Sequence, residues 1–409
     1  MADSSVKPEI LAPAGSPEKL KYAIAYGADA VYLGGTGFGL RAAAANFDLP
    51  SMARAVEYAH RHGVRVYVTL NIFAHHRDID ALPPYIKELA RLGVDAVIVS
   101  DLGVLSLVRE LAPALKVHIS TQANTTNWRT ARLWETLGAG RIVLARELSL
   151  EEIGTMRDHV GVELEVFVHG AMCVSYSGRC LLSNYMTGRG ANQGDCAQSC
   201  RWKYRLVEEK RPGEYFPFME DDRGTYILSS RDLCLLEHLP GLVKAGVTSF
   251  KIEGRVKSIH YAAAITRVYR QALDAYWSDP ENYSVRSEWL EEISKVSNRE
   301  YTTGFITGLR PGETPPAYSI YRRPYTFVGV VLGYDRQRSM LLVEQRNRFA
   351  RGETLEVLTP DRESFNLEVT EITDAEGNHL EAAPHPRQTV YLPWPGAVPQ
   401  MSLLRRAEH

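Results

Sequence analysis

The strongest constraint on the fold is a series of eight short apolar runs that alternate with longer amphipathic segments. Such alternation is typical of strands and helices that build a parallel sheet. Eight repeats within roughly 250 residues predict an α/β fold, a TIM-type (β/α)8 barrel. A doubly wound sheet has a similar pattern, but no second group of strands precedes residue 255, which favours the closed barrel. The runs end at Ala14, Gly35, Asn71, Ser100, Ser120, Ala145, Val168 and Gly254.

Local signals mark the starts and ends of the helices between these runs. Ser16 precedes a proline, and Ser149 stands three residues before Glu152, which is the spacing of a capping box. Glycines that suit a left-handed helix end stand just before four predicted strands, at Gly27, Gly63, Gly93 and Gly246. The alternation and the caps therefore predict the same helices.

One connection of the predicted barrel is far longer than the others, and such insertions tend to be functional. It runs from about residue 169 to 247, between the seventh and eighth strands, and it opens on the C-terminal face, where TIM barrels build active sites. All five cysteines of the 409-residue chain lie in it, at Cys173, Cys180, Cys196, Cys200 and Cys234.

The clustered thiols indicate a metal site, a redox pair or a nucleophile in a reducing cytosol, and buried structural cysteines are the alternative. Their spacing is not that of a zinc ribbon and includes no C-x-x-C pair. Four thiolates drawn from loops of unequal length can hold an iron-sulfur cluster.

The texture of the sequence changes after the last predicted strand. A helix, YAAAITRVYRQALDAYW, is expected to close the barrel, which we place at residues 8–276. A helical bridge and a proline-rich linker follow over 277–325. From 326 to 409, short strands between turn residues predict a small C-terminal β-barrel.

Charge and hydropathy restrict the partners and the compartment. No apolar run reaches the roughly 18 residues that cross a bilayer, and the N-terminus lacks a secretory pattern, so we expect a cytoplasmic protein with no membrane partner. With 47 Lys and Arg against 49 Asp and Glu, the chain has no overall basic field, and any RNA contact has to be local. Candidate contacts are Arg322 and Arg323 in the linker and Arg346, Arg348 and Arg351 beyond it, with a solvated surface as the alternative.

A family resemblance begins at the end of the seventh run. The segment EVFVHGAMCVSYSGRCLLS, from Glu165 to Ser183, resembles the signature of peptidase family U32, the collagenase-like peptidases. The resemblance continues through NQGDC, CRWKY, SSRDLC and FKIEGRVKSIHYAAAITRVYRQALD, so it covers the barrel and the bridge. Within the family, the chain is most similar to the branch of tRNA hydroxylation proteins.

The resemblance to this branch implies an enzyme that hydroxylates C5 of the wobble uridine in the anticodon loop of tRNA to 5-hydroxyuridine, without molecular oxygen. It implies prephenate as a required metabolite and a 4Fe-4S cluster. The implied ligands are Cys173, Cys180, Cys196 and Cys234. Cys200 is left over, but a related branch uses a closely spaced pair like Cys196 and Cys200, so the fourth ligand stays open. The electron donor and the oxygen source are not implied.

Polar residues at the ends of predicted strands are candidates for the site itself. Strand alternation places Lys251, Glu253 and Arg255 on one side, where buried charges either pair with one another or hold a ligand. We take Lys251, Glu253 and His169 as catalytic candidates, and orienting the cysteine loop is the alternative role for His169. The expected substrate-binding set is Asn71, Gln122, Arg146 and Arg255, and Glu147 is a further polar strand end. The two arginines would bind the carboxylates of prephenate.

Other functions compete with this one. A collagenase-like peptidase needs a nucleophile or an activated water, but the chain has no G-x-S-x-G or H-E-x-x-H motif. A Cys173–His169 pair has no evident third group to orient it. Hydroxylation of another RNA or of a small-molecule aromatic substrate, and a non-enzymatic RNA-binding role with a structural cluster, are the remaining alternatives.

Overall fold

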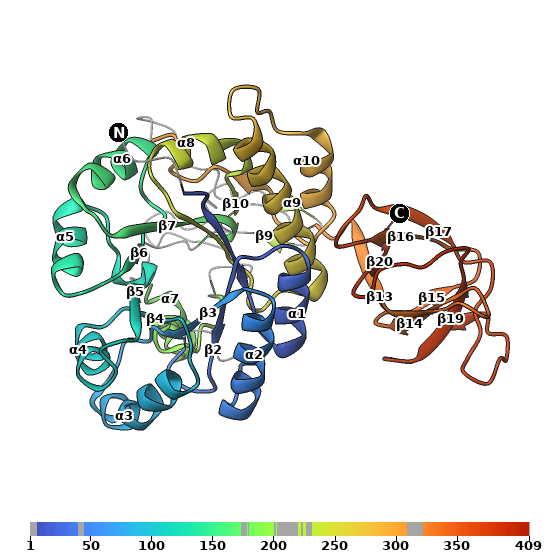
Figure 1. The fold of residues 1–409 in the computed structure, drawn as a ribbon, viewed down its shortest axis with the longest axis horizontal. Coiled ribbons are helices and arrows are strands. Elements are labelled where there is room, and N and C mark those ends of the chain that lie inside the picture. Colours follow the sequence, from blue (N-terminus) through green and yellow to red (C-terminus); the bar gives the residue numbers. More distant parts are fainter. Residues whose placement is uncertain are drawn as a thin grey trace, which may run out of the picture.

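Eight parallel strands form a closed barrel in the larger part of the molecule (Figure 1). The computed structural model describes residues 6–39, 45–172, 178, 180–199, 202, 220–221, 224–225, 231–308 and 322–408. Each barrel strand pairs with its neighbour, and the last one pairs with both the first and the seventh, which closes the ring. The strands are β1 (Glu9–Pro13), β2 (Ala30–Gly34), β3 (Arg65–Leu70), β4 (Ala96–Val99), β5 (Lys116–Ile119), β6 (Arg141–Val143), β7 (Glu163–Ala171) and β11 (Ser249–Ile252). All eight predicted runs form strands, and the TIM-type barrel is confirmed.

Helices cover the outside of the ring (Figure 1). They are α1 (Pro17–Ala25), α2 (Leu49–Arg61), α3 (His76–Arg91), α4 (Leu102–Leu111), α5 (Trp128–Thr136), α6 (Leu150–His159), α8 (Leu239–Lys244) and α9 (Ile259–Ser278). Ser16 caps α1 by accepting the backbone N–H of Lys19, and the Ser149–Glu152 capping box starts α6 as predicted. The four glycines before the strands have φ between 70 and 100°. No helix in the described part of the chain is both long and apolar enough to span a lipid bilayer.

The long connection after β7 adds short elements to the sheet and to the mouth of the barrel. β10 pairs antiparallel with the last residues of β7, and β12 pairs with β10. The elements are α7 (Leu182–Thr187), η2 (Ala191–Gln193), β8 (Glu220–Asp221), β9 (Gly224–Thr225), β10 (Asp232–Cys234) and η4 (Leu236–His238), with β12 (Tyr301–Thr302) following later in the chain.

Two contacts place this inserted segment on the C-terminal face of the barrel. The backbone N–H of Phe73, which follows β3, donates to the carbonyl of Asn192 at 3.0 Å. Gly178 lies so close to the carbonyl oxygen of Gln122, which follows β5, that a Cβ on it would approach that oxygen to 2.2 Å. The insertion therefore contacts the ends of two barrel strands on the face where an active site is expected.

The C-terminal part forms an antiparallel half-barrel with its own core (Figure 1). Its six-stranded sheet has the order β17-β16-β20-β13-β14-β19, and β15 pairs separately with β18. The elements are β13 (Tyr325–Asp335), β14 (Met340–Gln345), β15 (Phe349–Ala350), β16 (Thr354–Leu358), β17 (Phe365–Glu368), β18 (Ala382–Ala383), β19 (Thr389–Pro393) and β20 (Leu403–Ala407). Between barrel and sheet lies α10 (Ser287–Ser294). The boundaries proposed at 276 and 326 stay a prediction.

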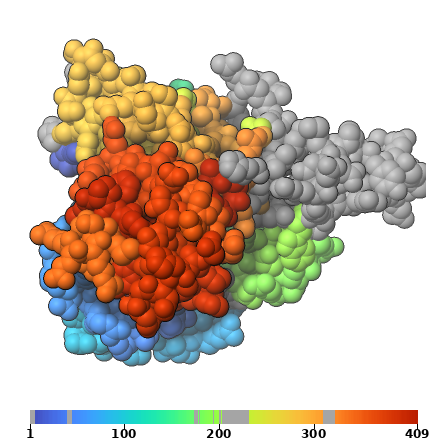
Figure 2. All heavy atoms as spheres, turned by 90° about the vertical axis from the view of Figure 1, so that its right-hand side faces the viewer, coloured from blue at the N-terminus to red at the C-terminus, as the bar shows by residue number. Residues whose placement is uncertain are grey.

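Buried charges fasten this sheet to the helices on one side of the barrel. Arg405 of β20 is fully buried, and its guanidinium lies 2.6 Å from Glu292 of α10 and 2.8 Å from Glu356 of β16. Arg267 of α9 donates to the carbonyl of Thr359 at 2.9 Å. Figure 2 looks onto the C-terminal part (red), with the barrel behind it. The two parts therefore share a buried polar interface.

One arginine of the group expected to contact RNA belongs to this interface instead. The Arg346 guanidinium is paired with Glu18 of α1 and with Glu344, and its side chain is only 15% exposed. Arg351 lies 3.6 Å from Glu381, and Arg322 lies 3.4 Å from Glu300. Arg346 is therefore used to join the two parts of the chain, and an RNA contact by the other arginines stays a prediction.

Candidate active site

The N-terminal end of the barrel interior holds a network of paired charges. Arg141 is bonded to Glu9 and lies 3.0 Å from Glu165, whose other oxygen lies 2.8 Å from Lys251 Nζ. Ser249 donates to Glu9 at 2.8 Å. None of these five side chains belongs to a residue more than 4% exposed. Buried charges are tolerated when they are paired and hydrogen-bonded. Glu9, Arg141 and Ser249 are the first residues of their strands, so this network fills the N-terminal end of the barrel.

The network fixes the ionisation of its central carboxylate. Burial alone would raise the pKa of Glu165, but the charges of Lys251 and Arg141 outweigh it and lower the pKa to about 2. Burial is also the main cause that lowers the pKa of Lys251. Glu165 is therefore an anion that is held between two cations.

The partner of Lys251 differs from the one expected. The alternation that was to align Lys251 with Glu253 and Arg255 stops, because β11 ends at Ile252. Lys251 points instead to Glu165 on the neighbouring strand β7. The sequence left open whether Lys251 pairs within its KIEGR segment or holds a ligand, and the structure pairs it with Glu165 instead.

Arg255 lies at the mouth of the barrel in a fixed position. It is 3% exposed, and its Nη1 donates to Thr69 Oγ1 of β3 at 3.1 Å. Gly34, the last residue of β2, leaves the space for it, because a Cβ there would lie 2.2 Å from that nitrogen. The guanidinium is therefore held across the ends of two strands before any ligand binds.

Two further cations flank the Phe167 ring on β7. The Arg146 guanidinium lies 3.9 Å from the ring centroid, and Lys251 Nζ lies 5.4 Å from it. Lys251 also lies 4.6 Å from the ring of Tyr32. Because Lys251 is already paired with Glu165, the positive character of the mouth comes from Arg146 and Arg255, which suit a ligand with carboxylate or phosphate groups.

The two amide candidates lie at the rim of the same mouth. Asn71 donates through Nδ2 to Ser120 Oγ at 3.2 Å, while its Oδ1 is buried and has no hydrogen-bond partner among the described residues. Gln122 lies in η1 (Thr121–Ala123), beneath Gly178 of the insertion. A buried acceptor without a partner is uncommon, so Asn71 Oδ1 is available to a ligand.

His169 lies behind the mouth in a cage of tyrosines. It is 1% exposed, and its Nδ1 lies 3.4 Å from the hydroxyl of Tyr269. Burial, helped by the charge of Lys257, lowers the pKa of His169 to about 3, so the ring is neutral. Its register partner on β10 is Cys234. These contacts fit the role of orienting the cysteine-bearing strand, and a catalytic role stays a prediction.

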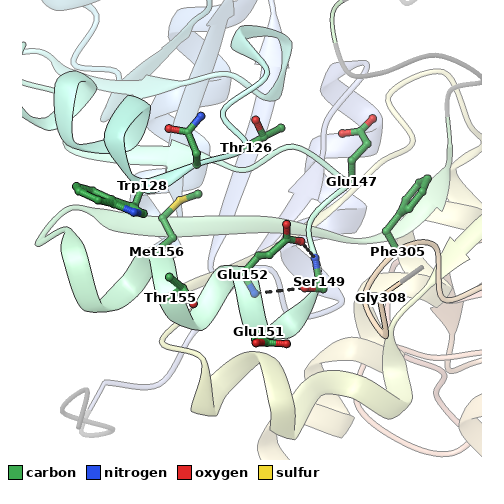
Figure 3. A pocket seen from close by; sticks show the side chains of 11 residues that line it. Thr126, Trp128, Glu147, Ser149, Glu151, Glu152, Thr155, Met156, Phe305 and Gly308 are labelled. Carbon is green, nitrogen blue, oxygen red and sulfur yellow. Dashed lines mark hydrogen bonds between the residues drawn. The ribbon is translucent and has the colours of Figure 1, made fainter. Parts of the chain in front are cut away.

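The two glutamates at predicted strand ends, Glu253 and Glu147, lie in different parts of the barrel. Glu253 is 7% exposed just after β11, and its backbone N–H donates to the carbonyl of His169 at 2.9 Å. Glu147 lines a pocket of about 660 Å³ between the N-terminal ends of α5 and α6 (Figure 3). Glu151 and Glu152 line the same pocket, and no arginine or lysine is among its described lining residues. This pocket therefore does not suit an anionic ligand, whereas the barrel mouth does.

Three of the four proposed cluster ligands are described, and all three are free thiols. Cys234 Sγ lies 3.8 Å from the hydroxyl of Tyr269, and burial raises the pKa of its thiol. Cys196 is exposed, and its Sγ accepts the backbone N–H of Gln198 at 3.4 Å. The carbonyl of Cys180 accepts Asn192 Nδ2 at 3.2 Å.

The cysteines of the insertion suit an iron-sulfur cluster by their residue type, and not by a grouping that the structure describes. Thiolates are the ligands that such clusters require, so the residue types fit. Within the part of the chain that the structure describes, no three Cys, His, Asp or Glu side chains are grouped closely enough to hold a metal ion. Cys173 and Cys200 lie outside the described residues. The cluster and its ligands therefore stay a prediction.

Sequence reasoning missed the partners that hold the predicted residues. Glu165 stands between Leu164 and Val166 in an apolar run, and Glu9 and Arg141 open apolar strands. A charge at an inward-facing strand position was the available signal, and it is the same signal that pointed to Lys251. Thr69, which holds Arg255, carries no such signal, because threonine is common in strands.

Comparison with known proteins gives matches along nearly the whole chain. Residues 15–314 match the model of peptidase family U32, and residues 323–405 match the model of the U32 C-terminal domain. The chain is 45% identical to tRNA hydroxylation protein P1 of Bacillus subtilis (strain 168), over 94% of this chain and 91% of that protein. It is 37% identical to tRNA hydroxylation protein P of Escherichia coli (strain K12), over 95% and 94%. A 23S rRNA 5-hydroxycytidine synthase of the same strain is 38% identical over 76% of this chain and 47% of that protein.

Proposed function

The chain belongs to peptidase family U32, and from that membership and the charge of the barrel mouth we propose that it is an RNA-modifying enzyme that hydroxylates a pyrimidine base. The three relatives described above carry names that refer to RNA hydroxylation. Those that match both parts of this chain are named for tRNA, so the finer proposal is C5-hydroxylation of the wobble uridine to 5-hydroxyuridine. A cytoplasmic location belongs to the same proposal.

The observation that carries the proposal is the set of cations at the mouth. Arg255 is held by Thr69, and Arg146 lies against the Phe167 ring, so an anionic metabolite has two charged partners there. Prephenate, a dicarboxylate, is the metabolite that we propose, with the two arginines as its carboxylate-binding forks. A base of a single-stranded loop is the part of an RNA that can turn out of its stack and reach such a mouth.

We also propose that the cysteines of the insertion hold a 4Fe-4S cluster next to the mouth. Cys173, Cys180, Cys196 and Cys234 would be its ligands, and the cluster would supply electron transfer when bound. The caged ring of His169 and the hydroxyl of Tyr269 lie against the Cys234 strand and position it.

The function is tested by nucleoside mass spectrometry of tRNA from cells that lack this protein. We expect 5-hydroxyuridine to disappear and to return with the wild-type chain but not with Arg255→Ala, because the anchored guanidinium is lost from the mouth. Arg61→Ala is the matched control, since Arg61 is exposed at the end of α2 that leads to the N-terminal side of the barrel. Cells that cannot make prephenate should also lose the modification.

Each result decides a different part of the proposal. Unchanged 5-hydroxyuridine in cells without the protein would refute tRNA hydroxylation. Loss of a hydroxycytidine from ribosomal RNA instead would identify ribosomal RNA as the substrate. Persistence of the modification in cells without prephenate would refute only the requirement for prephenate. Cleavage of collagen peptides by the purified chain would favour a peptidase.

The cluster is tested by iron and sulfide analysis after anaerobic reconstitution. The wild-type chain is expected to hold about four irons, and Cys234→Ser to lose most of them, because a 4Fe-4S cluster needs its thiolate ligands. Cys200→Ser, which removes the cysteine left over, should keep the wild-type content and the visible absorbance. Fewer than about two irons per wild-type chain would contradict the cluster.

A further inference from the structure

The Cys234 thiol, one of the proposed cluster ligands, has a buried tyrosine hydroxyl as its neighbour. Cys234 ends β10, which pairs antiparallel with the last residues of β7. Its Sγ lies 3.8 Å from the hydroxyl of Tyr269, a fully buried residue of α9. The same hydroxyl donates to the carbonyl of Val168 at 2.8 Å. It is therefore held between a backbone carbonyl of β7 and the sulfur.

The phenolic proton of Tyr269 gains a second acceptor when Cys234 binds iron as a thiolate. A thiol donates its own proton to the hydroxyl oxygen, so the phenolic proton stays with Val168. A thiolate has no proton and accepts one in a charge-assisted hydrogen bond. The carbonyl of Val168 also accepts the backbone N–H of Leu235 at 2.9 Å. It therefore keeps a partner when the phenolic proton turns to the sulfur.

His169 supplies a hydrogen-bond donor to the same hydroxyl oxygen. Its Nδ1 lies 3.4 Å from that oxygen, whereas its Nε2 is buried and has no hydrogen-bond partner in the described part of the chain. A neutral imidazole carries one N–H group, and the proton takes the nitrogen that has a partner. His169 therefore donates to Tyr269, and the phenolic proton stays available for the sulfur.

The surroundings of these three side chains make the hydrogen bonds strong. Tyr269 and His169 are almost inaccessible to water, and the rings of Tyr261 and Tyr301 lie 6.0 and 5.1 Å from the imidazole. Low-dielectric surroundings strengthen a hydrogen bond to a charged sulfur. Hydrogen bonds to the sulfurs help to set the potential of an iron-sulfur cluster. A donor favours the reduced cluster, because reduction adds negative charge that the donor stabilises.

We propose that Tyr269, supported by His169, donates a hydrogen bond to the Cys234 sulfur of the bound cluster and so raises the reduction potential of the cluster. Tyr269 is a positioning residue in this role, since it acts on the cluster through the ligand sulfur. This inference rests on the proposed function, because it takes Cys234 to be a ligand of the 4Fe-4S cluster. It assigns to α9 a control of the potential at which the cluster accepts an electron.

A redox titration of the reconstituted full-length protein with dithionite, followed by electron paramagnetic resonance of the reduced cluster, tests the inference. Tyr269→Phe removes the hydroxyl and keeps the ring. We expect it to lower the equilibrium constant of one-electron reduction about tenfold, which is about 59 mV in the midpoint potential. Tyr261→Phe is the matched control and should keep the wild-type potential, because Tyr261 is also buried beside the imidazole but donates to the carbonyl of Glu253. His169→Leu removes the donor to Tyr269 and should lower the potential by less.

The outcomes separate this inference from the proposed function. If the wild type holds no cluster after reconstitution, the proposed cluster fails and the inference fails with it. If the wild type holds about four irons and Tyr269→Phe has the same potential as Tyr261→Phe, the inference is overturned and the proposed cluster stands.

Iron analysis and a circular-dichroism melt are the checks on the variants. We expect Tyr269→Phe to keep both the iron content and the melt of the wild type. A normal melt with loss of iron would show that the hydroxyl is needed to hold the cluster and not to set its potential, which also overturns the inference. Should Tyr269→Phe fail to fold, an unshifted potential in His169→Leu is the result that overturns it.

Discussion

Replacing Glu165 by glutamine is expected to lower the free energy of unfolding by about 3 to 5 kcal/mol. The change keeps the shape of the side chain but removes the negative charge between Lys251 and Arg141, which lie 2.8 and 3.0 Å from its oxygens. Two buried cations then lose a carboxylate partner, and a buried charge without its partner is strongly destabilising. Chemical denaturation followed by circular dichroism measures the difference.

The control is Glu163→Gln, two residues earlier on β7. Glu163 also pairs with Arg141, at 2.6 Å, but its side chain is 51% exposed. An exposed pair contributes little, so this variant should lose less than about 1 kcal/mol. Equal losses for the two variants would show that burial of the charge is not what matters in this network.

The same network predicts how the effect of the substitution depends on pH. The pKa of Glu165 lies at about 2 in the folded protein and at its ordinary 4.5 in the unfolded chain. Its contribution to stability is therefore fully present above pH 4.5 and is lost as the pH falls toward 2. Denaturation curves at a series of acidic pH values should show the difference between wild type and Glu165→Gln shrinking as the pH falls.

Replacing Arg405 by methionine is expected to loosen the C-terminal sheet from the barrel, at a loss of about 3 to 5 kcal/mol. Arg405 is fully buried between the carboxylates of Glu292 and Glu356. Without it, Glu292 keeps only Arg267 at 3.8 Å and Glu356 keeps only Lys295 at 3.1 Å among the described residues. Differential scanning calorimetry should show the unfolding temperature falling, and limited proteolysis should cut between the two parts.

The neighbouring arginine on the same strand provides the matched control. Arg406 pairs with Glu353 at 3.0 Å, but its side chain is 27% exposed, so water replaces the lost contact in part. Arg406→Met should therefore unfold close to the wild-type temperature. If the Arg405 and Arg406 variants unfolded alike, the buried pairs would not be what joins the sheet to the barrel.

The fold could be predicted from the sequence because its determinants are local. The run from Arg65 to Asn71 predicts a buried strand by its apolar residues, and β3 spans Arg65–Leu70. Ser149 and Glu152 predict the start of α6 from a spacing of three residues, and both hydrogen bonds of the capping box form. Such signals need no knowledge of distant parts of the chain.

The arrangement of the site depends on the strand register, which no local pattern contains. Lys251 meets Glu165 because β11 pairs with β7, an association between residues 86 positions apart. Arg255 meets Thr69 across 186 positions, and the ring closes only after both strands are in place. The sequence could therefore indicate which charges are buried at the mouth, but not which partner each one meets.

The charge network at the N-terminal end of the barrel leaves the C-terminal mouth as the way into its interior. Glu9, Arg141 and Glu165 are bonded across the interior and nearly inaccessible to water, so they fill the N-terminal end of the barrel. Under the proposed function, the small metabolite and the RNA base use the same opening. Under that function, a metabolite that binds deeper in the barrel than the base would have to enter before the RNA and to leave after it.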